Sequence, residues 1–409
     1  MDFALSPRAQ PLLERVQGFI RDEIDPYELE RRREMEFGAD PWAVSPWVEE
    51  LKAKAKAQGL WNLFLPDPDQ GAGLSNVEYA PLAEAMGRSS VAAEVFNCNA
   101  PDSGNMELLH AYGSPAQKER WLRPLLEGEI RSAFCMTEPD VASSDATNME
   151  ATAVVDGGEI VLNGRKWWST GVGHPRCEVL IFMGLTDPAA HKYSQHSMVL
   201  VPRDTPGVTV GRMLRTMGFL DAPGGHGEVT FDNVRLPLDH VIGGPGRAFE
   251  IAQNRLGPGR IHHCMRLIGL AERALELACE RAAGRVAFGK PLANLGGNRE
   301  RIADARIAIQ QARLLVLHAA WLLDTQGLLG ALSAVSQIKV AVPNMAQRVV
   351  DMAMQIHGGA GLSDDEPFGA MWTTARALRI ADGPDEVHRG VVARIELGPY
   401  LQRARDAGA

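Results

Sequence analysis

The spacing of apolar residues changes twice along this chain, and this double change constrains the fold more than any single motif. From residue 5 to about 131, apolar residues recur three and four positions apart, which is the spacing of one helix face. From about 132 to 243, short β-branched runs alternate with Asp-Gly and Asn-Gly turns, a pattern typical of strands joined by hairpins. From about 248 to 401 the helical spacing returns in longer segments.

This order predicts an α+β fold with three domains. They are an N-terminal helical domain (1–131), a central antiparallel β domain (132–245) and a C-terminal four-helix-bundle domain (246–409). The expected strands are 151–155, 159–162, 179–182, 197–201, 207–210 and 228–231. The long expected helices are 260–281, 298–325 and 331–358.

Composition narrows the class of protein and its compartment. Hydrophobic residues make up 45% of the 409 residues and charged residues 23%, as in a soluble globular protein. The formal charge of −9 argues against a nucleic-acid partner, which requires a basic face. Five scattered cysteines without a Cys-x-x-Cys pair suit a reducing compartment. With no secretory signal, peroxisomal tripeptide or 18-residue apolar run, we expect a cytoplasmic protein with no integral membrane association.

Two segments of the expected β domain are suited to a flat ligand. Residues 134–145 read Phe-Cys-Met-Thr-Glu-Pro-Asp-Val-Ala-Ser-Ser-Asp, where a proline fixes one turn dihedral and small residues allow close backbone approach. Residues 166–170, Lys-Trp-Trp-Ser-Thr, place an aromatic wall beside hydroxyl groups, as a flavin ring requires. The structural alternatives are an ordinary strand-ending turn and tryptophans that fill the β-domain core.

Three segments of the C-terminal region could also carry chemistry. Residues 284–290 nearly spell a phosphate-binding P-loop, but position 291 is proline and the preceding segment is helical, which excludes that motif. Residues 355–361, Gln-Ile-His-Gly-Gly-Ala-Gly, form a helix cap or let backbone approach a pyrophosphate. Residues 381–388, Ala-Asp-Gly-Pro-Asp-Glu-Val-His, place a carboxylate in a turn.

Together these motifs resemble the acyl-CoA dehydrogenase family, and the resemblance covers essentially the whole chain. The segments Thr-Glu-Pro-Asp-Val-Ala-Ser-Ser-Asp, Gly-Pro-Gly-Arg-Ile-His-His-Cys and Asp-Gly-Pro-Asp-Glu-Val-His resemble one subgroup, whose animal members carry a fused phosphotransferase-like kinase domain. The resemblance implies the helical–β–helical architecture, FAD as cofactor and an acyl-CoA substrate. It also implies an electron-transferring flavoprotein as acceptor and a homodimer or homotetramer.

The resemblance assigns roles to individual residues. The implied FAD-binding residues are Phe134, Met136, Thr137, Ser144, Trp168, Ser169 and Thr170, with Arg285, Phe288, Gln355, Gly358 and Gly359 reaching the FAD of a neighbouring subunit. The implied substrate-binding residues are Ser144, Gly257, Arg260 and Gly383. Arg285 alone could equally be a solvated cation at a helix end.

The resemblance places the catalytic base at Asp382, 24 residues after Gly358, with Arg260 supporting its loop. The implied reaction removes the α-proton of an acyl-CoA while the β-hydrogen leaves as hydride to flavin N5. The backbone N–H of Asp382 is implied to bind the thioester carbonyl together with a flavin hydroxyl. The family usually has glutamate at this position, so the aspartate shortens the reach by one methylene. Pro384 and Glu386 replace the usual threonine and glutamine.

Several alternatives remain open at this point. Besides dehydrogenation to a 2-enoyl-CoA, the subgroup suggests flavin-assisted conversion of a 4-hydroxy- or 4-phosphoryloxyacyl-CoA with loss of phosphate. A catalytically silent flavoprotein and an oxygen-reactive C–H oxidase are further hypotheses. Asn97, Asn99 and Asp102 could line a polar acyl pocket, or form a turn and N-cap before a helix at 106–111. His262-His263-Cys264 lacks the i, i+4 spacing of helical metal ligands.

Overall fold

The structure is a computed structural model that describes residues 4–407, and it divides into two compact units. One unit, called here the helical unit, comprises the segments up to Leu29, Leu74–Ala93 and from Gly257 onward. The other, called here the sheet unit, comprises Glu30–Gly73 and Glu94–Leu256. Each unit is therefore assembled from segments that lie far apart in the sequence.

The sheet unit is built on one seven-stranded sheet in the described part of the chain. Its strands are β1 (Arg131–Cys135), β2 (Thr152–Asp156), β3 (Glu159–Thr170), β4 (Cys177–Leu185), β5 (His196–Pro202), β6 (Val208–Leu214) and β7 (His226–Pro237). They are ordered β1-β4-β2-β3-β7-β6, and β5 also pairs with β4. Six strands overlap the predicted runs. The sheet is mixed rather than wholly antiparallel, because β1, which lay outside the predicted runs, runs parallel to β4, as does β2.

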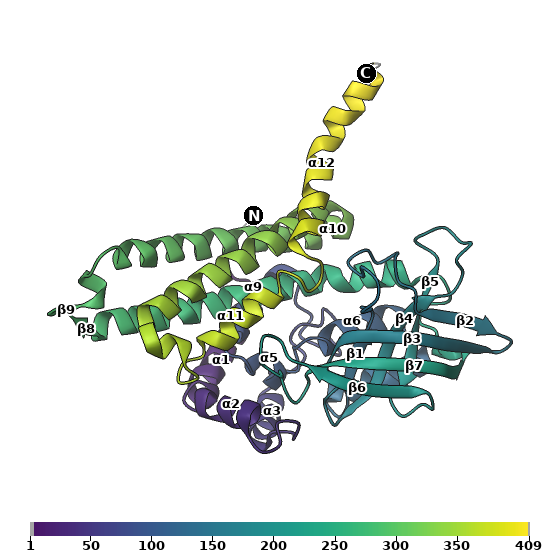
Figure 1. Cartoon of the computed structure of the whole chain (residues 1–409), viewed down its shortest axis with the longest axis horizontal. Coiled ribbons are helices and arrows are strands. Elements are labelled where there is room, and N and C mark those ends of the chain that lie inside the picture. Colours follow the sequence, from purple (N-terminus) through teal and green to yellow (C-terminus); the bar gives the residue numbers. More distant parts are fainter. Residues whose placement is uncertain (1–3, 408–409) are drawn as a thin grey trace. The chain divides into compact units, whose positions relative to one another are not determined.

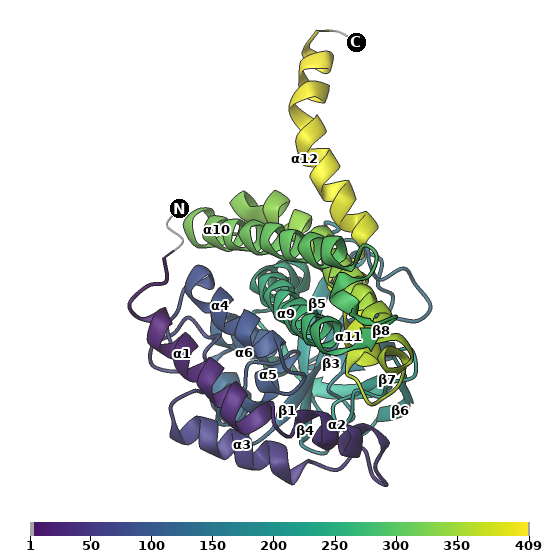
Figure 2. The same cartoon turned by 90° about the vertical axis from the view of Figure 1, so that its left-hand side faces the viewer.

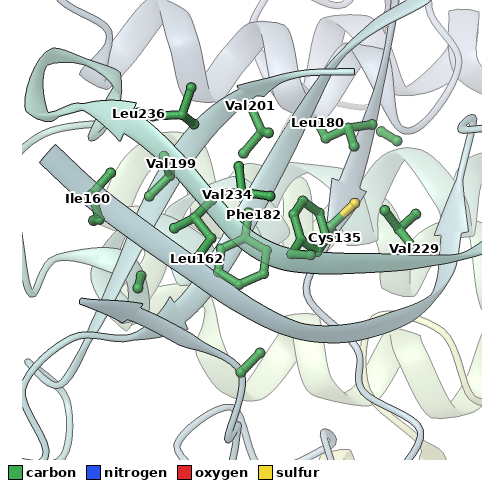
Figure 3. Packing of buried hydrophobic residues seen from close by; sticks show 14 of the residues in the cluster. Cys135, Ile160, Leu162, Leu180, Phe182, Val199, Val201, Val229, Val234 and Leu236 are labelled. Carbon is green, nitrogen blue, oxygen red and sulfur yellow. The ribbon is translucent and has the colours of Figure 1, made fainter. Parts of the chain in front are cut away.

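One face of the sheet carries the apolar core of this unit. Figure 3 shows side chains from β3, β4, β5 and β7 meeting there. The rings of Phe182 and Phe231 lie 4.6 Å apart between centroids. Burying each large apolar side chain contributes about 1.5–3 kcal/mol, so this face anchors the strands that carry the flavin motifs.

Shorter helices complete the sheet unit. They are α3 (Pro46–Ala57), α6 (Asp102–Tyr112), α7 (Pro115–Gln117) and α8 (Arg123–Glu127), with the C-terminal parts of α2 (Glu28–Phe37) and α5 (Ala92–Val95). A π-helical segment at Lys118–Leu122 follows α7 in this unit, and another at Ile20–Ile24 follows α1 in the helical unit.

The helical unit contains α1 (Ala9–Phe19), α4 (Asn76–Gly87), most of α9 (Ala248–Gly284), α10 (Asn298–His357), α11 (Phe368–Ala377) and α12 (Asp385–Asp406). Gly327, with φ 68° and ψ −175°, divides α10 into two helices, which agree with the predicted 298–325 and 331–358. α4 crosses α9 closely, since a Cβ on Gly269 would lie 1.9 Å from the carbonyl oxygen of Glu84. α10 packs against α11 and α12 (Figure 1), and it also packs against α4.

α12 starts beside α10 and then projects from the rest of the helical unit. Figures 1 and 2 both show this C-terminal helix extending away from α10 and α11. Its buried residues are Asp385 and His388, both in its first turn. Large apolar side chains farther along it, Ile395, Leu397, Tyr400 and Leu401, are exposed.

α10 also bears on the question of membrane association. Among the described residues, Asn298–Leu362 contains an 18-residue window with a mean hydropathy of 1.3, so this helix is long and apolar enough to span a membrane. This is weak evidence, because the core helix of a soluble protein passes the same test. The absence of integral membrane association stays a prediction.

Candidate active site

The predicted base lies in a turn between α11 and α12 whose backbone is held from two sides. Asp382 has φ 57° and Gly383 has φ 105°, both in the left-handed region. A Cβ at Gly383 would lie 2.7 Å from Nε2 of His388, so only glycine fits there. The carbonyl oxygen of Asp382 accepts hydrogen bonds from Arg260 Nε at 3.2 Å and His388 Nε2 at 3.1 Å. The structure thus brings the predicted catalytic pair together through the backbone of Asp382.

Lys339 supports this turn from α10. Its side chain is only 1% exposed, and Nζ donates to the carbonyl oxygens of Leu378 and Ala381 at 2.7 and 2.6 Å. Burial lowers the pKa of Lys339, whereas the nearby charge of Asp382 raises it. Lys339 thus provides hydrogen bonds to backbone carbonyls just after α11, and it also places a buried amine near the carboxylate of Asp382.

The carboxylate of Asp382 faces His263 of α9. Nε2 of His263 lies 3.4 Å from Oδ2 of Asp382, and Nδ1 of His263 lies 3.2 Å from Nη2 of Arg266. Because a guanidinium can only donate, the neutral imidazole accepts at Nδ1 and carries its hydrogen at Nε2, facing Asp382. His263 therefore offers a donor that stabilises the ionised carboxylate of Asp382.

The first turn of α12 fixes the other end of this loop. Oδ2 of Asp385 accepts from Arg379 Nε and Asn344 Nδ2, each at 3.0 Å. Pro384 occupies the N-cap position with φ −66°, a dihedral that its ring enforces. The proline at position 384, where the family usually has threonine, thus suits the start of α12.

His388 makes the stability of this loop depend on pH. Burial and then the charge of Arg260 lower the pKa of His388 to about 4. In the unfolded chain His388 binds a proton below about pH 6.5, the ordinary histidine pKa, whereas in the folded chain it does so only below about pH 4. The free energy of unfolding therefore decreases as the pH falls from about 6.5 to about 4. Between pH 7 and pH 5 we expect a loss of about 2 kcal/mol from this residue.

Replacing His388 with glutamine, which keeps a side-chain N–H donor, should remove that share of the pH dependence. Urea unfolding of both proteins at the two pH values measures it. The comparison with wild type is necessary because burial also lowers the pKa of His174 in the sheet unit to about 4. Equal losses in the two proteins would show that His388 does not titrate as its surroundings indicate.

In the sheet unit, a buried ion pair fixes the loop that follows β1. Nζ of Lys166, completely buried, lies 2.7 Å from Oε1 of Glu138 and donates to the carbonyl of Met136 at 2.9 Å. Glu138 also accepts from the backbone N–H groups of Glu150 and Ala151 at 2.9 and 3.1 Å. Burial lowers the pKa of Lys166, while Glu138 raises it. These contacts tie the residue 134–145 loop to β3.

The two predicted flavin segments lie next to each other. The N–H of Trp167 donates to the carbonyl of Thr137 at 3.0 Å, which brings the loop and the end of β3 together. Trp168 has φ 50° and an exposed side chain, so it does not fill the core as the structural alternative proposed. Ser169 is buried, whereas Thr170 is partly exposed.

Phe134 and Ser144 complete the predicted set in this unit. The guanidinium of Arg255 lies 4.1 Å from the ring centroid of Phe134, and its Nε donates to Oδ1 of Asn105 at 3.1 Å. Ser144 is exposed in the loop. An exposed indole, adjacent hydroxyls and a fixed polar loop are groups that fit a flavin ring.

The residues expected to reach a neighbouring subunit lie in exposed positions. Arg285 leads into a two-stranded hairpin, β8 (Val286–Ala287) and β9 (Lys290–Pro291), and not into a P-loop. Phe288 at its tip has φ 51° and is 96% exposed. Gln355 is exposed near the end of α10, and a Cβ at Gly358 or Gly359 would meet nothing within 4 Å.

Gly257, one of the predicted substrate-binding residues, is buried in α9, where a Cβ would lie 2.8 Å from Leu328.

The polar cluster before α6 lies in a turn, as the structural reading predicted, but neither Asp102 nor Ser103 caps the helix. Asn97 is buried and donates to Asn62 Oδ1 at 2.7 Å, and Asn99 accepts from Arg131 at 3.0 Å. Asp102 accepts from the backbone N–H of Ser132 at 2.7 Å and pairs with Arg131 at 2.8 Å. The N-cap position of α6 is Pro101, without a side-chain cap. These side chains hold protein groups instead of lining a polar acyl pocket.

The three residues of the His-His-Cys run have different partners. The ring of His262 makes an edge contact with Tyr79 at 4.8 Å between centroids, whereas His263 faces Asp382. Burial raises the pKa of the Cys264 thiol to about 12. This divergence follows from the rotation of about 100° between successive helical residues.

Comparison with known proteins decides the family. Models of the N-terminal, middle and C-terminal domains of acyl-CoA dehydrogenases match residues 6–129, 133–234 and 246–397. The chain is 51% identical over 402 residues to the probable acyl-CoA dehydrogenase FadE2 of Mycobacterium tuberculosis, covering 97% of each chain. This chain belongs to the acyl-CoA dehydrogenase family.

Two further relatives set the limits of the comparison. Mouse acyl-CoA dehydrogenase family member 10 is 56% identical over 398 residues, which are 96% of this chain but 37% of that protein. A solved structure of an acyl-CoA dehydrogenase candidate from Mycobacterium abscessus shares 72% identity with a TM-score of 0.95, covering 97% of this chain and 100% of that one. The chain thus spans well under half of this animal relative. Membership of the family confirms the predicted fold class.

Proposed function

We propose that this chain is an FAD-dependent acyl-CoA dehydrogenase that converts a saturated acyl-CoA into the 2-enoyl-CoA. FAD is the cofactor of this family, and when bound it supplies the acceptor for the β-hydride. The observation that carries the proposal is the Asp382 turn, in which a carboxylate faces His263 while Arg260 and His388 hold its backbone.

In the proposed reaction Asp382 takes the α-proton of the acyl thioester. The N–H of His263 stabilises the ionised carboxylate before the transfer, and the buried cations Arg260 and Lys339 keep it ionised. The backbone N–H of Asp382 is proposed to bind the thioester carbonyl, where negative charge develops as the proton leaves.

The sheet unit is proposed to hold the flavin. Trp168 and Thr170 offer an aromatic wall and a hydroxyl, and the Lys166–Glu138 pair keeps the neighbouring loop in one conformation. Ser144, Met136 and Thr137 complete this surface. The domain boundaries at 131 and 245 remain part of the proposal, supported by the three matched segments.

Anaerobic addition of a saturated medium-chain acyl-CoA to the purified flavoprotein tests this function. We expect lasting bleaching of the flavin band and a 2-enoyl-CoA product. Conversion of 4-phosphoryloxyacyl-CoA to enoyl-CoA with phosphate release, but no lasting bleaching, would instead establish the elimination reaction. A flavin that no acyl-CoA bleaches would indicate a silent flavoprotein, and rapid reoxidation by oxygen would indicate an oxidase.

We further propose that the chain forms a homodimer or homotetramer that works in the cytoplasm and passes electrons to an electron-transferring flavoprotein. The almost fully exposed Phe288 and the exposed apolar side chains of α12 support self-association, since water contact with such groups is unfavourable. We propose that a second copy of this chain covers these exposed side chains, because Arg285 and Gln355 are expected to contact the flavin of a neighbouring subunit.

Replacing Leu397 and Leu401 with serine should weaken the oligomer. Each side chain is more than half exposed, and burying a leucine contributes about 1.5–3 kcal/mol, so the two together should shift dissociation to at least about tenfold higher concentration. Sedimentation of serial dilutions measures the shift. Val154→Ser, on an exposed position of β2, is the control and should leave the oligomer unchanged. A double variant that sediments like wild type would exclude α12 from the interface.

A further inference from the structure

A hydroxyl, an imidazole and a carboxylate form a continuous hydrogen-bonded chain at the end of β3. Thr170 lies directly opposite His226 in the β3–β7 ladder, and Oγ1 of Thr170 is 2.9 Å from Nδ1 of His226. Nε2 of His226 is 3.0 Å from Oδ2 of Asp221, in the loop before β7. The ring of Trp168 lies 5.5 Å from that of His226. Trp168 and Thr170, two of the predicted flavin contacts, therefore lie at the same end of β3 as this chain of groups.

The direction of these hydrogen bonds follows from the chemistry of each group. Burial opposes ionisation of Asp221, but the hydrogen bond from His226 lowers the pKa of Asp221. An ionised carboxylate only accepts, so Nε2 of His226 carries a hydrogen, and the neutral ring accepts at Nδ1. Thr170 must then donate its hydrogen to His226. The remaining lone pairs of Oγ1 are left to face any other partner.

The surrounding charges are few and defined. The charge of Arg32 in α2 lowers the pKa of Asp221, and the carboxylate of Glu36 in the same helix accepts a hydrogen bond from the N–H of Leu220. Beside His226, Arg212 of β6 pairs with Glu228 of β7 at 2.7 Å. The carbonyl of Trp168 lies 3.5 Å from Oγ1 of Thr170 and is a weaker acceptor than the imidazole at 2.9 Å. The hydroxyl is therefore directed mainly by His226.

We propose that His226 and Asp221 are positioning residues that make the Thr170 hydroxyl a hydrogen-bond acceptor toward the flavin, and thereby favour the reduced cofactor. The inference rests on the proposed function, in which Thr170 borders the flavin. Reduced flavin carries an N–H at the ring nitrogen that oxidised flavin presents as a bare acceptor. An accepting hydroxyl therefore suits the reduced form, and a donating hydroxyl suits the oxidised form.

The midpoint potential of the bound flavin, measured by equilibration with a reference dye, tests the inference. His226→Leu leaves Thr170 free to donate, and we expect about a tenfold shift toward oxidised flavin, or about 30 mV for this two-electron couple. Asp221→Asn should shift it in the same direction. In a Thr170→Val background, His226→Leu should cause no further shift, because the hydroxyl that transmits the effect is gone.

Two further variants separate a positioning role from a structural one. His226→Asn keeps an acceptor near the position of Nδ1, so its potential should lie closer to the wild-type value than that of His226→Leu. His191→Leu, an exposed histidine in the loop before β5, is the matched control and should leave the potential unchanged.

The outcomes also separate this inference from the proposed function. Bleaching by acyl-CoA with an unchanged potential in His226→Leu would overturn the positioning role alone. The expected shift in a flavoprotein that no acyl-CoA bleaches would support the positioning role and overturn the dehydrogenase function. A protein that binds no flavin would overturn both.

Discussion

Replacing Asp382 with asparagine should slow flavin reduction by a saturated acyl-CoA by about 100- to 10,000-fold. This is the range that a positioned general base contributes, and the asparagine amide cannot accept the α-proton. The amide keeps the size of the side chain and can still contact His263, so the turn that Arg260 and His388 hold should persist. Anaerobic stopped-flow measurement of flavin bleaching gives the rate directly.

Two checks make this result specific. The variant must retain the flavin content and visible spectrum of the wild type, which shows that the fold and cofactor site survive. Asp304→Asn, an exposed carboxylate on α10, should bleach at the wild-type rate. If Asp382→Asn also bleached at that rate, another group would have to be the base.

The largest expected loss of stability comes from Glu138→Leu. Its partner Lys166 is completely buried and would be left as an uncompensated charge, which costs about 3–5 kcal/mol. Removing the carboxylate also leaves the N–H groups of Glu150 and Ala151 without this acceptor. Denaturant unfolding followed by intrinsic fluorescence measures the change in the free energy of unfolding of the sheet unit.

The double variant Glu138→Leu/Lys166→Met should recover much of that loss, because an apolar pair no longer carries a buried charge. A neighbouring surface pair provides the control. Arg165 and Asp140 lie 3.0 Å apart with side chains 48% and 70% exposed, so Asp140→Ala should cost at most about 1 kcal/mol. A Glu138→Leu protein as stable as Asp140→Ala would refute the anchoring role of the buried pair.

The alternation between helical and β spacing predicted most of the fold, because each region buries one face of its elements. The sequence did not reveal β1, whose residues are buried almost without alternation and which runs parallel to β4. The sequence pattern also predicted that a helix starts at residue 260, whereas α9 begins at Ala248 and passes through Gly257, Pro258 and Gly259 before that residue. Packing overrides the local propensity of those residues.

The candidate site was predictable only where its residues lie in continuous motifs. Asp382, Gly383 and Arg260 were found, but Lys339 and His263 come from helices distant in sequence, and their distances to the base depend on tertiary packing. One signal was available: Lys339 and Lys166 each interrupt an apolar element, and a buried lysine requires partners. The chain formed by Thr170, His226 and Asp221 depends on strand register, which the periodicity alone does not give.

The central claim is that this protein breaks the Cα–H bond of an acyl-CoA while its flavin is reduced. The most direct test compares the anaerobic rate of flavin bleaching by a saturated acyl-CoA with that of the same substrate carrying deuterium at the α-carbon. Removal of the α-proton during reduction predicts a clearly slower rate with the deuterated substrate. Equal rates that persisted across pH, or no bleaching by either substrate, would contradict the claim.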